Sequence, residues 1–372
     1  MSHDTDIAEV LLVAHRLEEG ETAPGRGTFV NLWQAPRLVT DALAALNAIS
    51  TAAQGAIHRC EGPPVGGVPI IVGGDQWGEL LDAPLGSGPW TGARWKRALV
   101  AQFASALRRG ELWSADGTHI IARLKMTCLS DMVSVGPQDR QIRGNLGRFD
   151  SYHGWNASDQ FPALWRHRES VHKALRRDPN ARLVPQPGRN HAPIWAQSGT
   201  LHFTRDIQYD SQRVAAVRTR ERALGIRAWF TMTVPATDDA EQTRREMACA
   251  LWANSTPGLL LHADHANRAQ QGRGTGSKAM LEALPILDML ALDEWQLEAA
   301  EAIWRSFTDR EFESFHRCAI DPARIALDRL VVRDMLGLDS NAEMTVRRLR
   351  ELLVVEPSIH GSKQPELPVG ED

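Results

Sequence analysis

Residues 251–288 constrain the fold of this chain more than any other stretch. An apolar run reaches Asn254–Thr256 and then meets Pro257, whose ring lacks a backbone N–H and clashes with the preceding helical turn. A helix predicted over Asp238–Ala253, with acidic residues in its first turn, must therefore end or bend here. The alternative is a helix that runs on through Leu261. A loop rich in Gly, Arg and Lys follows, and then Leu-Pro-Ile-Leu-Asp.

Apolar periodicity divides most of the remaining chain into short strands and amphipathic helices. Strands are predicted over Asp6–His15, Gly27–Trp33, Val65–Gly74, Ile120–Met126, Cys128–Val135, Leu201–Arg205, Arg213–Thr219 and Arg227–Val234. Helices are predicted over Arg37–Ala53, Thr91–Gly110, Trp295–Phe307, Asp321–Leu336 and Met344–Val355. This mixture predicts the α+β class.

The overall charge of the chain bears on whether it can bind DNA by itself. The 372 residues are enough for two or three packed units, and their formal net charge is −4 with a pI near 6.4. A free-standing DNA-binding domain is usually basic. The balance therefore argues against strong autonomous DNA binding, although it leaves room for a local basic face.

The cysteines and the apolar runs point to a cytoplasmic protein. Cys60, Cys128, Cys249 and Cys318 are too widely spaced for a zinc motif or a dense disulfide framework. A reducing compartment is the simplest interpretation. We also expect no signal peptide and no membrane span, because no run approaches the ~20 apolar residues that a span needs.

Several segments carry a family resemblance through their order along the chain. They are Ser2–Leu17, Gly25–Trp33, Pro162–Ser170, Leu201–Arg220 and Leu251–Asp288. Together they resemble the distal part and the target-recognition regions of bacterial N6-adenine DNA methyltransferases, and the specificity modules of type I or type IIG restriction–modification systems. The resemblance covers most of residues 1–340. The alternative is an unrelated α+β protein.

The motifs that would make such a protein an enzyme are absent from the sequence. Enzymes of this family carry Asn/Asp-Pro-Pro-Tyr/Phe, which holds the flipped adenine, and a Gly-rich loop for S-adenosylmethionine. Neither occurs here. The resemblance therefore implies a non-catalytic chain with no cofactor and no catalytic residue of its own. S-adenosylmethionine is expected only on a partner chain.

The resemblance also implies how the chain is divided. Residues 1–114 would form an α/β unit like the terminal strands of a methyltransferase fold, and residues 115–290 an irregular, β-rich recognition domain. Residues 291–355 would be a helical segment of the kind that docks partner subunits. Residues 356–372 are acidic and carry Pro and Gly, which predicts disorder.

Candidate DNA contacts lie on basic stretches within the resembling regions. Gln138–Gly147 is a polar, basic loop, and Arg205–Arg227 holds six arginines against three acidic residues. Arginine binds phosphate or pairs with guanine through two hydrogen bonds. The candidates are Arg143, Arg213, Arg218, Arg220, Arg273 and Lys278. A solvated strand face explains any single arginine equally well. Arg166–Arg182 is a second candidate patch.

Two other motifs are weaker. Gly272–Lys278 resembles a phosphate loop, but Ser277 breaks the required spacing, and a plain surface loop is equally compatible with it. His262 and His265 lack a third ligand, so no metal site is predicted.

The predicted partners are double-stranded DNA and a methyltransferase or another subunit of an anti-phage defence complex, with no membrane. The alternative, which the acidic balance favours, is an interaction scaffold in such a complex that has lost DNA contact.

Overall fold

The computed structural model describes residues 26–32, 36, 38–54, 68–84, 95, 97–152, 160–165, 174–209, 211–270 and 273–356. The predicted strand Asp6–His15 and the predicted tail 356–372, apart from Glu356, lie outside the described residues, as do residues 166–173 of the second basic patch. The fold is α+β, as the sequence predicted. Among the described helices, none is both long enough and apolar enough to cross a membrane.

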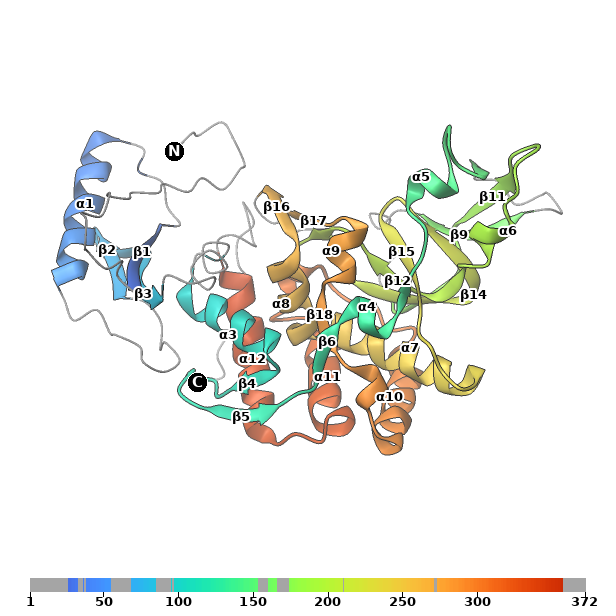
Figure 1. The fold of residues 1–372 in the computed structure, drawn as a ribbon. Coiled ribbons are helices and arrows are strands. Elements are labelled where there is room, and N and C mark those ends of the chain that lie inside the picture. Colours follow the sequence, from blue (N-terminus) through green and yellow to red (C-terminus); the bar gives the residue numbers. More distant parts are fainter. Residues whose placement is uncertain are drawn as a thin grey trace, which may run out of the picture.

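A three-stranded antiparallel sheet and one helix form the N-terminal unit (Figure 1, blue). Its strands are β1 (Arg26–Leu32), β2 (Val68–Val72) and β3 (Asp75–Pro84), with β3 in the middle. Helix α1 (Val39–Gln54) contributes Ala52 to a small core with Ile70 and Leu80. The β2–β3 turn is Gly73–Gly74, with φ of 61° and 93°, because a tight turn of this kind needs left-handed backbone.

A curled, mixed eight-stranded sheet dominates the rest of the molecule (Figure 1). Its path is β7-β15-β12-β14-β9-β11-β8, and β10 pairs with β14 off this path. The strands are β7 (Ser134–Val135), β8 (Phe149–Tyr152), β9 (Phe161–Trp165), β10 (Arg176–Arg177), β11 (Ala181–Pro185), β12 (Gly199–Thr204), β14 (Ala216–Ile226) and β15 (Trp229–Thr233).

Strand β14 joins two hydrophobic cores. Its first half pairs with β12 and β10, and its last residues pair in parallel with β9. The first half contributes Ala216 and Val217 to the main core, which runs from Trp95 to Leu353. The last residues contribute Leu224 and Ile226 to a smaller core with Phe149, Trp165 and Leu183.

Helices α7 and α10 cover one side of the main sheet, and α3, α11 and α12 pack beyond them around α8 (Figure 1). Their bounds are α3 (Ala98–Arg108), α7 (Asp239–Asn254), α8 (Thr256–His265), α10 (Glu294–Phe307), α11 (Pro322–Leu330) and α12 (Ser340–Val355). A π-helical turn, Val331–Met335, continues α11. The main core thus includes α3, which precedes residue 114, together with the C-terminal helices.

Short elements connect these layers. They are β4 (Glu111–Trp113), β5 (Ile120–Arg123), β6 (Met126–Cys128), α4 (Leu129–Met132), α5 (Asp139–Ile142), α6 (Ala192–Trp195), β13 (Ile207–Gln208), β16 (Asn267–Gln270), β17 (Arg273–Thr275), α9 (Lys278–Glu282), β18 (Pro285–Leu287) and the 3-10 turns Met289–Ala291 and Phe315–Arg317.

Two local sequence predictions are wrong. The strand predicted over Cys128–Val135 is instead the helix α4 followed by β7, because Leu129 and Met132 are buried at helical spacing. The loop predicted over Gln138–Gly147 begins with the short helix α5, which a capping box between Gln138 and Gln141 stabilises.

The helix break near Pro257 lies where the sequence predicts it, between α7 and α8. Ser255 has extended backbone and ends α7, and its side chain caps α8 by accepting from the backbone N–H of Gly258. A side chain at Gly258 would come within 2.1 Å of the Trp252 carbonyl. Glycine is therefore needed for α8 to turn back so closely against α7.

Candidate nucleic-acid interface

The polar residues at the break after α7 form a buried structural junction. Asn254 exchanges hydrogen bonds with the backbone at Ala215 (2.8 Å) and Ala216 (2.7 Å). Thr256 donates to the Asp328 carboxylate from its backbone N–H at 2.7 Å and from its hydroxyl at 2.6 Å. These contacts join α7 and α8 to β14 and α11. The segment therefore organises the core, and its polar side chains are buried.

Arg218 and Arg213, two of the predicted DNA contacts, both bind partners within the protein. The Arg218 guanidinium pairs with the Glu246 carboxylate of α7 at 3.0 Å and lies 5.8 Å from the Trp304 ring centroid. The Arg218 side chain is only 12% exposed. Arg213 donates to the carbonyl of Phe312 at 2.8 Å. Both guanidiniums are therefore committed to internal partners.

The other candidates beyond residue 213 lie on separate elements. Lys278 begins α9 and donates to the carbonyl of Val135 at 2.8 Å. Arg220 is 57% exposed and pairs with Asp178 at 3.0 Å. Arg273 lies in β17, a backbone strand between β13 and β16. Lys278, Arg220 and the backbone of Arg273 thus lie on three different elements.

Arg143 marks a different region, the small core at the end of the sheet. Its guanidinium makes two hydrogen bonds to the Asp139 carboxylate, of 2.6 and 2.8 Å, and lies 5.1 Å from the centroid of the Trp165 ring. Helix α5 supplies Asp139, and the end of β9 supplies Trp165. Two elements far apart in sequence thus fix the position of this arginine.

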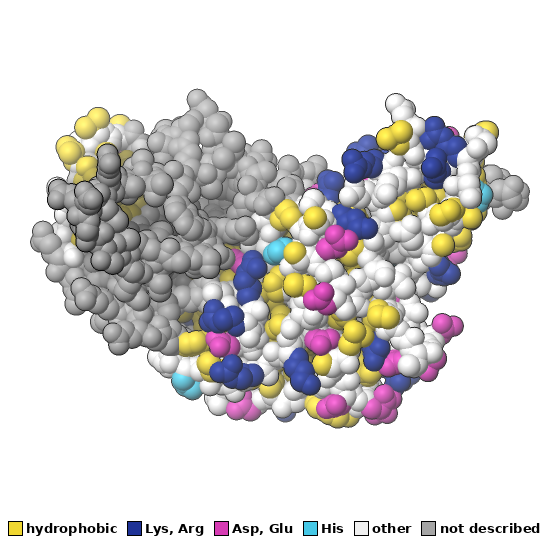
Figure 2. Space-filling model, in the orientation of Figure 1, with side chains coloured by type: hydrophobic (Ala, Val, Ile, Leu, Met, Phe, Trp, Pro, Cys, Tyr) yellow, Lys and Arg dark blue, Asp and Glu magenta, His cyan; other side chains and the backbone are white. Residues whose placement is uncertain are grey.

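The elements around this small core form a strongly basic surface, which we call the basic lobe. It comprises the described residues 138–150, 160–165, 174–198 and 219–228. These ranges hold ten arginines and four carboxylates, whereas the whole chain has fewer basic than acidic side chains. Dark-blue side chains accordingly gather at the upper right of the molecule, around α5 (Figure 2). The charge of the chain is therefore unevenly distributed.

The four carboxylates of the basic lobe all have partners of their own. Asp139 holds Arg143, Asp178 holds Arg220, and Glu221 lies 3.5 Å from Arg182. Asp150 accepts from the side-chain amide of Gln186 at 2.8 Å.

Apart from the buried Arg177, five arginines of the lobe have no carboxylate within salt-bridge distance among the described residues, and these are Arg140, Arg148, Arg189, Arg222 and Arg227. Arg189 and Arg222 donate to backbone carbonyls, and Arg140, Arg148, Arg222 and Arg227 are exposed. The lobe thus carries positive charge that the described residues do not neutralise.

Arg227 is held in an unusual backbone conformation. It lies in the two-residue turn between β14 and β15 and, with φ of 59°, is the one non-glycine residue with positive φ in the described part of the chain. Because β14 and β9 pair in parallel, Ile226 lies opposite Trp165. The Arg227 guanidinium is consequently 5.7 Å from the Trp165 ring centroid. Its backbone N–H donates to Asp139 Oδ1 at 3.2 Å.

Sequence reasoning did not single out these five arginines. The run Arg205–Arg227 contains two of them, Arg222 and Arg227, and the basic loop Gln138–Gly147 contains Arg140. The composition of both stretches was therefore a usable signal. Which arginine in each stretch lacks a carboxylate depends on contacts between β9, β11, β14 and α5, and these contacts are not visible in one sequence.

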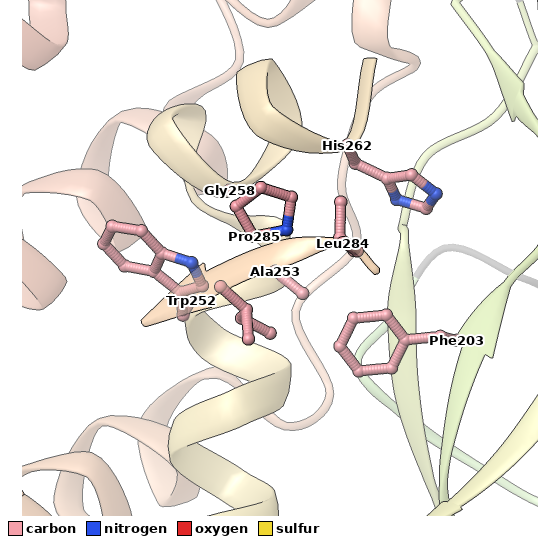
Figure 3. A pocket seen from close by; sticks show the side chains of 8 residues that line it. Phe203, Trp252, Ala253, Gly258, His262, Leu284 and Pro285 are labelled. Carbon is pink, nitrogen blue, oxygen red and sulfur yellow. The ribbon is translucent and has the colours of Figure 1, made fainter. Parts of the chain in front are cut away.

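A small cavity lies between α7, α8 and β12 (Figure 3). Its lining includes Phe203, Trp252 and His262, and its volume is about 10 Å³. That is room for about one water molecule, whereas sites for cofactor-sized molecules measure several hundred Å³. Burial lowers the pKa of His262 to about 3, and the nearby His265 adds to this. The cavity is therefore a packing defect beside a neutral histidine.

The histidine pair near the end of α8 is split between two environments. His262 lines the cavity, whereas the His265 ring hydrogen-bonds the carbonyl of Met280 at 2.6 Å. Within the described residues, no group of three or more His, Cys, Asp or Glu side chains is arranged to hold a metal ion.

Comparison with known proteins gives a structural likeness. No protein-family model matches the chain, and no curated protein matches it. The crystal structure of the type IIG restriction endonuclease BpuSI is similar to it with a TM-score of 0.44 and 13% sequence identity. The match covers 87% of this chain and 39% of that chain, so this chain spans well under half the length of the neighbour.

Proposed function

We propose that this chain recognises DNA, with the basic lobe as its DNA-contacting surface. The observation that carries the proposal is the set of five arginines in the lobe that no described carboxylate neutralises, in a chain whose net charge is negative. Surfaces that bind the phosphate backbone concentrate arginine and lysine in this way. Of the six contacts expected from sequence, Arg143 and Arg220 belong to this surface.

The chain would act together with a separate adenine methyltransferase or with another subunit of a restriction–modification or defence complex. The ordered family-like segments and the missing Asn-Pro-Pro-Tyr motif support this division of labour. In this proposal the chain is not an enzyme and the partner chain holds S-adenosylmethionine. A methyl-transfer assay with labelled S-adenosylmethionine tests this part, because activity of the isolated chain would overturn it.

Salt dependence gives the sharpest test of DNA contact. Each phosphate contact releases counterions, so five arginine contacts predict a slope of about −4 to −5 for log K against log salt concentration. We would measure fluorescence anisotropy of a labelled 30-base-pair duplex (about three helical turns) with the full chain, alone and with its methyltransferase partner. Absence of salt-sensitive binding in both samples would reject the proposal.

A charge-matched pair of variants locates the surface. Arg140→Ala/Arg148→Ala removes two exposed cations from the basic lobe. Arg305→Ala/Arg347→Ala removes two from α10 and α12, where the side chains are 74% and 69% exposed. We expect the first variant to weaken binding about tenfold and to make the salt slope shallower by about 2, and the second to change neither. Equal losses in the two variants would place the contact elsewhere.

The second candidate function is a protein-interaction scaffold, which the surface of α1 favours. Leu38, Val39, Leu43 and Leu46 are exposed by 66%, 78%, 57% and 59%, and from Val39 onward they follow helical spacing. Exposed apolar faces of this kind mark protein–protein contacts. A complex with the methyltransferase chain that forms after nuclease treatment, survives Arg140→Ala/Arg148→Ala and dissociates with Leu43→Glu/Leu46→Glu would favour this function.

A further inference from the structure

We propose that Arg227 is the specificity-determining contact of the basic lobe, and that its guanidinium pairs with a base edge presenting two adjacent acceptors, as guanine does with O6 and N7. This inference rests on the proposed function, because it assigns one role within the DNA-contacting surface. Trp165 and Asp139 act as positioning residues for Arg227.

The backbone of Arg227 is fixed in a conformation that an arginine rarely adopts. Its φ of 59° lies in the left-handed region, where glycine is favoured because it lacks a Cβ. The hydrogen bond from its N–H to Asp139, 3.2 Å long, ties this turn to α5. The turn would be less strained with glycine at this position. The presence of an arginine there therefore indicates a role for its side chain.

The side chain lies beside an aromatic ring. The Trp165 ring lies 5.7 Å from the Arg227 guanidinium and 5.1 Å from that of Arg143, so the two cations share one aromatic platform. Asp139 neutralises Arg143 through two hydrogen bonds, but only the backbone of Arg227 reaches that carboxylate. The donors of the Arg227 guanidinium make no hydrogen bond with the described residues.

The neighbouring ring favours a base contact over a phosphate contact. A planar guanidinium beside an aromatic ring suits the two-acceptor edge of a base, whereas phosphate accepts a cation from many directions. Among the described residues, the exposed Arg140 and Arg148 have neither an aromatic platform nor a bonded carboxylate, and these are the phosphate-positioning groups of the lobe. The arrangement therefore fits a division of roles, in which Arg227 contacts a base edge and Arg140 and Arg148 contact phosphates.

Selection from a pool of duplexes with a randomised central region tests this assignment in the full chain with its partner. We compare the wild type with Arg227→Gly, which removes the side chain and suits the positive φ, and with Arg227→Lys, which keeps the charge without the planar fork. Arg140→Ala/Arg148→Ala is the control for phosphate contacts. Circular dichroism and thermal unfolding confirm that each variant is folded.

We expect the wild type to enrich a motif with guanine at one position, and both Arg227 variants to lose preference at that position alone, with discrimination falling about tenfold or more. The Arg140→Ala/Arg148→Ala control should bind more weakly but keep the motif. An unchanged motif in Arg227→Gly, or tolerance of lysine, would overturn the assignment and make Arg227 a structural or phosphate contact.

The remaining outcomes separate this inference from the proposed function. Wild-type binding that enriches no motif would overturn the specificity role and leave DNA binding intact. A wild type that retains no duplex at low salt would reject DNA recognition itself, and the role of Arg227 with it.

Discussion

Asp139 Oδ1 accepts the backbone N–H of Arg227 at 3.2 Å, across 88 residues of sequence. The same carboxylate holds the guanidinium of Arg143, so one acidic side chain links α5 to the turn after β14. Trp165, at the end of the neighbouring strand, lies beside both guanidiniums. The arrangement keeps two positive charges close together with a single carboxylate, which leaves the surface basic and ordered.

Replacing Asp139 should therefore change DNA affinity, through the charge of the basic lobe, and stability, through the lost contacts to Arg143 and Arg227, in opposite directions. Asp139→Ala removes the acceptor that orients Arg143 and Arg227, and it raises the net charge of the basic lobe by one. We expect tighter binding of DNA regardless of sequence, by about two- to threefold at low salt, and a loss of unfolding free energy of about 1 kcal/mol, since the Asp139 side chain is 35% exposed. Anisotropy titrations and urea denaturation measure the two effects.

A matched acidic substitution controls for charge alone. Asp178→Ala also removes one carboxylate from the lobe, but this side chain is 71% exposed and pairs only with the exposed Arg220. It should raise DNA affinity to a similar extent without changing stability by more than about 0.5 kcal/mol. Weaker DNA binding in Asp139→Ala would contradict the phosphate-contacting role of the lobe.

Two arginines on β14 should respond very differently to alanine. Arg218 pairs with Glu246, whose side chain is 1% exposed, so Arg218→Ala leaves a carboxylate buried without its counter-ion. We expect a loss of about 3 kcal/mol in unfolding free energy. Arg220→Ala affects a 57% exposed side chain and should cost less than about 0.5 kcal/mol. Chemical denaturation of both variants checks this, and similar losses would show that the Arg218 pair is dispensable.

Some elements of the fold could be predicted from sequence because their signals are local. Helix α10 shows apolar residues at helical spacing, and Pro257 follows the end of α7. The sequence predicted a strand where the structure has α4, because a four-residue helix is too short to show helical periodicity in its apolar residues.

The candidate surface was harder to predict, because the sequence shows where an arginine lies along the chain but not whether a carboxylate pairs with it in the fold. Arg218 pairs with Glu246, 28 residues away, whereas the Arg227 guanidinium pairs with no carboxylate in the described part of the chain. Both arginines belong to one basic run in the sequence. What separates them is that Arg218, in the first half of β14, faces helix α7, whereas Arg227 lies in the exposed turn after β14, beside α5. Tertiary packing therefore decides which charges are available to a ligand.

Buried histidines predict a pH dependence of stability. Burial lowers the pKa of His202 and of His262 from 6.5 to about 3, helped in the first case by the charge of Arg218 and in the second by His265. Between these values the unfolded chain binds protons that the folded chain does not. Stability should thus be full above about pH 6.5 and fall as the pH drops toward 3, by about 1.4 kcal/mol per pH unit for each histidine.

Urea denaturation between pH 7 and 5 measures this slope. His262→Gln replaces an imidazole at the edge of the small cavity with a group that does not titrate, and it should make the slope shallower. His119→Gln, at an exposed position, should leave the slope unchanged. Equal slopes in all three proteins would show that protonation of His262 is not coupled to unfolding.

Arg227 offers a direct test of backbone strain at the candidate surface. Arg227→Gly and Arg227→Ala remove the same guanidinium, but only alanine keeps a Cβ in the left-handed conformation. The glycine variant should be more stable than the alanine variant by about 1 kcal/mol, the usual cost of that conformation for an L-residue. Urea denaturation of the two proteins gives this difference, and equal stabilities would mean that the turn relaxes to a negative φ once the Trp165 contact is lost. A measured difference would show that the turn keeps its left-handed backbone without the Trp165 contact, and that a side chain at this position costs stability.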